Sequence, residues 1–215
     1  AYKRFGNFGK ISVDYSLQYN HRREFDVRRG ELSTIPSLDL ELITNQLNIN
    51  NLIERANWNW ETGIDLSYQN NYSTPETQAR RLVPNYNKYS GGMYSIFKYN
   101  FSPKFNVEAG LRYDLTQYKV KKWYDESDWN NLYATDFSQF YVKTDGNRVF
   151  TEPVLNFENL SFNVGIQWVP SEQFNLKLNY AKVGRSPNIA ELFADGLHHS
   201  ASVLELGNMG LKNED

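Results

Sequence analysis

The stretch that decides the fold is WNWETGIDLSYQ, residues 58–69, in which apolar and polar side chains alternate. The even positions carry Trp58, Trp60, Thr62, Ile64, Leu66 and Tyr68, and the odd positions carry Asn59, Glu61, Gly63, Asp65, Ser67 and Gln69. Successive side chains of a β-strand point to opposite faces of the sheet, so the stretch predicts a strand with one apolar and one polar face. The function depends on whether the apolar face lies against a protein core or against lipid.

The same alternation recurs along the chain. It predicts seven strands, at residues 8–22, 38–53, 58–69, 91–101, 105–116, 160–169 and 174–183. In the second strand, Leu38, Leu40 and Leu42 share one phase and Leu47 and Ile49 share the other. This change of phase predicts a β-bulge near residues 44–46. Residues 184–215 are expected to form a loop with one helical turn around residues 190–194.

The connections between the predicted strands alternate in length. Short turns lie at residues 54–57, 102–104 and 170–173, and long connections lie at 23–37, 70–89, 117–159 and 184–215. Brief turns join antiparallel neighbours, so all the short turns lie at one end of the sheet and all the long loops at the other. Outer-membrane barrels sort their loops in this way, whereas soluble sandwiches seldom do.

Aromatic residues form two groups along the strands. Those beside the short turns are Trp58, Trp60, Phe101, Phe105, Trp168 and Phe174, and those toward the long loops are Tyr19, Tyr68, Tyr113 and Tyr180. Ten residues separate Trp58 from Tyr68. At a rise of ~3.3 Å and a tilt of ~40° they span roughly 25 Å, the height of a barrel's apolar band. The spacing favours lipid over the interior of a soluble, lipocalin-like barrel.

Composition excludes several classes of function. The chain has 215 residues, a net charge of −2 and no cysteine. It therefore has no disulfide, no zinc–thiolate site and no cysteine nucleophile, and its charge does not indicate nucleic-acid binding. No apolar run approaches the roughly 18 residues that a membrane-spanning helix needs. The chain runs directly into a strand without a signal peptide, so we expect that a leader was removed or that the sequence begins within a longer protein.

Two boxes near the end of the chain are the most specific motifs. They read LNYAKVGRSPNIAEL at residues 178–192 and ELGNMGLKNE at residues 205–214. Together with GLRYD at 110–114 they resemble TonB-dependent outer-membrane receptors. The positions that match the family's boxes are Arg185, Pro187, Glu191, Gly207, Asn208, Leu211 and Glu214. The chain departs from the family at Gly184, where Phe is common, and at Met209, where Pro is usual.

The resemblance implies an all-β fold, an antiparallel up-and-down meander that supplies about seven strands of a 22-stranded barrel. Residues 1–215 would be part of the barrel domain, with no plug domain. It further implies an active-transport receptor in the outer membrane of a Gram-negative bacterium. The transported nutrient would be a ferric siderophore, haem or zinc, with no permanently bound cofactor. The partners would be membrane lipid, the nutrient at the external loops, and the TonB complex acting through the plug.

The loop between the two boxes contains His198 and His199. In haem receptors of the family a histidine in this place is a candidate ligand, and neutral imidazole commonly binds metals. Adjacent side chains on a strand point to opposite faces, which disfavours binding of one metal by both. The alternative is a surface pair without a role in ligand binding.

The long connection 117–159 offers further candidate ligand contacts. Trp123, Tyr124 and Trp129 are mixed with acidic residues there, a combination suited to recognising a nutrient at the external mouth. Alternatively, the segment extends the two flanking strands as a hairpin, with a turn at Asp145-Gly146. Arg80 and Arg81 are suited to an anionic ferric chelate, or else form a solvated pair.

Charged residues complete the prediction. Arg185 and Glu191 are expected to pair and order their loop. Glu61, Asp65, Glu108, Arg112 and Asp114 lie on the polar face, which in a barrel is the lumen. No nucleophile and base accompany these carboxylates, so we expect no enzymatic activity.

A passive porin-like barrel and a soluble small-molecule-binding barrel remain the alternatives. An isolated piece of wall would have unpaired edges and a bare apolar face, and would self-associate.

Overall fold

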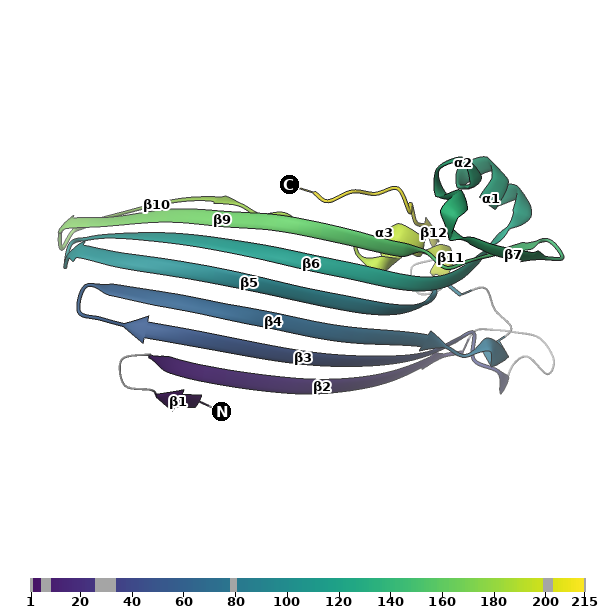
Figure 1. The fold of residues 1–215 in the computed structure, drawn as a ribbon, viewed down its shortest axis with the longest axis horizontal. Helices are drawn as coiled ribbons and strands as arrows, with labels where there is room; N and C mark the ends of the chain where they lie inside the picture. Colours follow the sequence, from purple (N-terminus) through teal and green to yellow (C-terminus); the bar gives the residue numbers. More distant parts are fainter. Residues whose placement is uncertain (1, 5–8, 26–33, 78–80, 199–202, 215) are drawn as a thin grey trace.

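The computed structural model describes residues 2–4, 9–25, 34–77, 81–198 and 203–214. Within them the dominant feature is one open antiparallel sheet, whose long strands run horizontally, one above another, in Figure 1. Its long strands are β2 (Lys10–Glu24), β3 (Leu38–Glu54), β4 (Trp58–Ser73), β5 (Asn85–Ser102), β6 (Phe105–Asp125), β9 (Val154–Ser171) and β10 (Phe174–Lys182). These are the seven predicted strands, so the all-β meander is confirmed.

The remaining elements are short. They are β1 (Tyr2–Arg4), η3 (Pro75–Thr77), α1 (Glu126–Leu132), α2 (Ala134–Phe137), η4 (Ser138–Phe140), β7 (Tyr141–Asp145), β8 (Arg148–Thr151), α3 (Ile189–Phe193), β11 (Asp195–His198) and β12 (Val203–Leu206). None of the helices in the described residues is long and apolar enough to cross a membrane.

Strand pairing confirms the two faces. Leu47, Leu66, Gly91 and Leu115 lie opposite one another on successive strands, in one row of the apolar face. On this outer face large apolar side chains are open to their surroundings, with Met93 60% and Leu178 66% exposed. The inner face carries the polar positions. The fold therefore lacks a protein core behind most of its apolar surface, as a membrane-facing wall requires.

The bulge predicted near residues 44–46 is wrong. Pairing of β3 with β2 runs without a register shift, through Thr44, Asn45 and Gln46. The change of phase has a tertiary cause: Leu42, on the inner face, packs against a buried cluster at the long-loop end. There the inner face is covered by other parts of the chain, so an apolar side chain is favoured on it.

The long loops contain more strand than predicted. β6 continues to Asp125 and β9 begins at Val154, so residues 117–159 extend the two flanking strands as a hairpin. This is the alternative that the sequence predicted for the segment. The β7–β8 hairpin turns at Gly146, whose φ of +58° favours glycine. Residues 184–215 contain the helical turn α3 and the hairpin β11–β12.

The buried core lies at the long-loop end of the inner face. Its members are Tyr86, Tyr118, Val120, Tyr124, Trp129, Val149, Phe157, Leu192, Phe193 and Met209. They come from the ends of β5, β6 and β9, from the 126–151 region, and from the C-terminal segment, which lies beside the sheet at this end in Figure 1. The core thus joins the C-terminal loop to the wall.

Candidate functional site

The candidate site is built around Arg185, where the two sequence boxes meet. Its guanidinium lies 3.0 Å from the Glu191 carboxylate and 2.8 Å from that of Glu214. The backbones of Arg185 and Glu214 also exchange two hydrogen bonds, of 2.8 and 3.0 Å. We call the three residues the clamp. It closes the base of the 185–214 loop, and it confirms the predicted Arg185–Glu191 pair.

Glu191 also caps helix α3. Its carboxylate accepts the backbone N–H of Asn188 at 2.7 Å, while the Asn188 side chain accepts the N–H groups of Ala190 and Glu191. This reciprocal capping box satisfies donors that a helix start leaves free. The hydrogen bonds from Arg185, and then the one from Asn188, hold the pKa of Glu191 below its usual value. The carboxylate therefore stays charged at neutral pH, and the clamp persists.

The second box packs directly onto α3. The N–H of Gly207 donates to the Ala194 carbonyl at 2.7 Å, and that of Asn208 donates to the Glu191 carbonyl at 2.8 Å. A Cβ on Gly207 would lie 2.4 Å from the Phe193 nitrogen, so only glycine allows this approach. Met209, which follows Asn208, is 2% exposed and belongs to the buried core.

The remaining family-motif positions lie around this contact. Pro187 is buried, and its carbonyl accepts the Tyr118 hydroxyl at 3.3 Å. Leu211 lies at the surface, where its N–H donates to the Asn208 carbonyl. The seven residues, which come from two separate sequence boxes, thus form one continuous structure on the inner face.

A buried ion pair, which the sequence did not predict, joins the loop to the wall. Lys122 of β6 donates to the Asp195 carboxylate at 2.8 Å and to the Phe193 carbonyl at 3.2 Å. The two side chains are 6% and 11% exposed. Lys122 shares the inner phase of β6 with Val120 and Tyr124, and this charged residue in an apolar row was the signal available in the sequence.

The predicted aromatic contacts separate into two places. Tyr124 and Trp129 are each 4% exposed, and their rings pack with that of Tyr133, whose hydroxyl donates to the Gly207 carbonyl at 3.3 Å. Trp123 is half-buried, and the Arg148 guanidinium lies 4.2 Å from its ring centroid. The first two residues therefore support the loop from within, and their contact with a ligand stays a prediction.

The basic and histidine candidates are placed only in part. Arg81 lines a small cavity of about 20 Å³ together with Trp123 and Asp195. His198 ends β11, where its backbone pairs with Val203. Arg80 and His199 lie outside the described residues. Within the described ranges no group of three metal-binding side chains occurs.

The mid-height inner wall carries the predicted lumen charges. Arg112 contacts Asp65 and Asp114, each at 2.7 Å, beside a hollow of about 570 Å³ that Glu61 also lines. The Asp114 and Arg112 side chains lie across Gly92, where a Cβ would be 2.4 Å from the carboxylate. A glycine here lets the charged side chains lie flat on the wall.

A family model described as "TonB dependent receptor-like, beta-barrel" matches residues 2–215. The chain belongs to this family. Its members lie in the outer membrane of Gram-negative bacteria, so this TonB-dependent receptor chain is part of an outer-membrane barrel wall. The lipid-facing reading of the alternating stretches is confirmed with it.

A solved structure, the copper transporter OprC, has a similar fold. The TM-score is 0.59 and the sequence identity is 14%, over 95% of this chain and 31% of that chain. At this identity the likeness shows the fold alone, and the receptor chain spans less than a third of the OprC chain. No curated protein matches the sequence.

Proposed function

We propose that the full-length protein is a receptor that carries a scarce nutrient across the outer membrane, energised by the TonB complex through a plug domain. The observation that supports this proposal is the family match over residues 2–215. The meeting of both sequence boxes in the clamp agrees with it. The described sheet is open, so transport is assigned to the complete barrel.

We further propose that the ligand is an anionic metal chelate such as a ferric siderophore or haem. Arg81 and Lys121 lie around the same small cavity as Trp123, and Arg148 stacks on the Trp123 ring. Guanidinium and indole groups together suit a flat or aromatic anion. Zinc is the alternative cargo, with His198 or His199 as ligand, and the name of OprC adds copper to the cargoes worth testing.

Uptake of labelled ligands by cells that carry the full-length receptor tests both proposals. The ligands are a ferric siderophore, haem, zinc and copper, each compared with and without a functional TonB complex. Loss of uptake without TonB, with the ligand recovered chemically intact, supports an active transporter that is not an enzyme. Uptake that persists without TonB and rises in proportion to concentration contradicts it and indicates a passive barrel.

A further inference from the structure

The outer face of the sheet contains a hollow of about 770 Å³ that Gly91 lines. Leu66 and Leu115 flank Gly91 on the neighbouring strands, and Leu47 continues the row. Only the Leu66 Cδ2 atom, at 3.3 Å, and the Asp65 carbonyl, at 3.8 Å, lie within 4 Å of the position a Gly91 Cβ would occupy. The missing side chain leaves an apolar groove in the lipid-facing surface.

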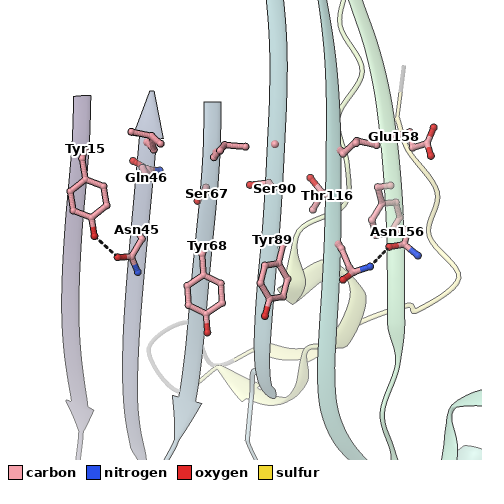
Figure 2. Close-up of a pocket in the computed structure, with 16 residues that line it drawn as sticks. Tyr15, Asn45, Gln46, Ser67, Tyr68, Tyr89, Ser90, Thr116, Asn156 and Glu158 are labelled. Atoms are coloured by element: carbon pink, nitrogen blue, oxygen red, sulfur yellow. Dashed lines mark hydrogen bonds between the residues drawn. The ribbon is translucent and has the colours of Figure 1, made fainter. Parts of the chain in front are cut away.

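A polar rim borders the groove on the long-loop side. Tyr15 donates to Asn45 at 2.7 Å, and Gln117 donates to Asn156 at 2.8 Å. Figure 2 shows the rings of Tyr15, Tyr68 and Tyr89 inclined in the same direction, toward the long-loop ends of their strands. Tyrosines with an apolar ring and a polar tip mark the boundary between hydrocarbon and headgroups. The groove thus lies just on the hydrocarbon side of that boundary.

A second hollow, of about 420 Å³, adjoins the rim further toward the loops, and Lys119 and Lys121 line it. Lys119 Nζ lies 5.5 Å from the centroid of the Tyr89 ring, so this lysine connects the two hollows. Lys121 pairs with Glu152 at 3.8 Å. In the described part of the chain Lys119 has no carboxylate partner, which leaves it available to an anion.

Among the described residues that line the groove one is acidic, and its carboxylate is hydrogen-bonded. Glu158 accepts the Tyr113 hydroxyl at 2.7 Å. Glu158 keeps its negative charge at the edge of the groove. In the second hollow Glu152 is paired with Lys121, so the charge left there is the positive charge of Lys119. Apolar lining below, hydroxyl and amide groups between, and an available ammonium above match the order of groups in an anionic lipid.

We propose that the two hollows form one binding site for a phosphate-bearing lipid of the membrane. One acyl chain lies in the groove over Gly91, and the phosphate lies beside Lys119. The groove lies on the face of the sheet opposite the clamp and the lumen charges, and Lys121 is shared with the small cavity beside Trp123. It would anchor a specific lipid at the wall near the external loops.

Lipid retained by the full-length receptor, purified in detergent, tests the proposal. The protein is mixed with phosphatidylglycerol or with phosphatidylcholine of the same acyl chains, and bound lipids are counted by native mass spectrometry. The wild type is expected to retain phosphatidylglycerol in preference. Gly91→Leu fills the groove and should abolish retention of both lipids. Ala109→Leu places a leucine on the same face outside the groove, and should leave retention unchanged.

The headgroup contact is tested separately. Lys119→Gln should lower the preference for phosphatidylglycerol about fivefold, the effect of one lysine near a lipid surface. Lys121→Gln, whose charge is already paired, should change it less. Equal retention in the wild type and Gly91→Leu, or equal loss in Gly91→Leu and Ala109→Leu, would overturn the site. So would a preference that survives Lys119→Gln, which remains decisive if the Gly91 variant does not fold.

Discussion

Arg185 and Glu214 are 29 residues apart in the sequence, yet they pair through both backbones and both side chains. Between them the chain forms α3 and the β11–β12 hairpin, and Leu192 and Phe193 of α3 lie in the core on the inner face of the wall. Because Glu191 shares the same guanidinium, one arginine orders the start and the end of this loop.

Replacement of Arg185 tests whether the clamp holds the loop. Arg185→Gln removes both ion pairs and should increase amide hydrogen exchange several-fold at Glu191, Asn208 and Glu214, since local opening becomes easier. Exchange is measured on the full-length receptor by mass spectrometry. Lys177→Gln, on the exposed strand β10, is the control. Unchanged exchange in Arg185→Gln would show that the core alone holds the loop.

Acid should open the clamp. The pKa of Glu191 is lowered in the folded protein from 4.5, so the charged carboxylate favours the closed loop. Its contribution is fully present above pH 4.5 and is lost as the pH falls through the folded-state pKa. Amide exchange near Glu191, corrected for intrinsic rates, should therefore rise below pH 4.5. Glu191→Gln keeps a capping side chain without the charge, and its exchange should lack this pH dependence.

The Lys122–Asp195 pair should be costly to break from one side. Lys122→Met leaves the Asp195 carboxylate buried without its ammonium, and should destabilise the local structure by about 3–5 kcal/mol. The double variant Lys122→Met, Asp195→Leu should recover most of that loss, since both charges are removed together. Protection of the Asp195 amide, which donates to the Leu82 carbonyl, reports the local stability. A double variant no better than the single one contradicts the expectation.

Adjacent glycines of β5 provide a matched pair. Gly92→Ala places a Cβ 2.4 Å from the Asp114 carboxylate and 2.5 Å from Arg112, so the ends of both side chains must shift and their ion pair is disturbed, which should destabilise the barrel by about 1 kcal/mol. Gly91→Ala faces the membrane, where the nearest atom is the end of a leucine side chain at 3.3 Å, and should cost less. Denaturant unfolding of the full-length receptor compares them. An equal cost for both would show that the flat packing of Arg112 is unimportant.

The 215-residue chain expressed alone should self-associate. All nine residues of the edge strand β10 are exposed, and the outer face is apolar. Unpaired edges and bare apolar faces favour pairing between copies. Sedimentation in plain buffer should show oligomers or aggregates, and detergent should reduce their size. A folded monomer in plain buffer would contradict this expectation.

The seven strands and their two faces were predictable because the side-chain period of two is a local property. Arg185 and Glu191 were predictable as a pair because they lie in one short box. The inner phase of Leu42 was not, since the buried cluster it packs against is assembled from segments far apart in the sequence. The predicted bulge was wrong for that reason.

The sequence by itself determined the meander, the sorting of loops by length, the lipid-facing side and the family boxes. Only the tertiary structure decided that the boxes meet in one clamp. It also decided that Tyr124 and Trp129 are buried beneath the loop, and that Lys122 pairs with Asp195, 73 residues away. Alternation specifies the face on which a side chain lies, whereas the partner it meets there depends on which distant segment packs against that face.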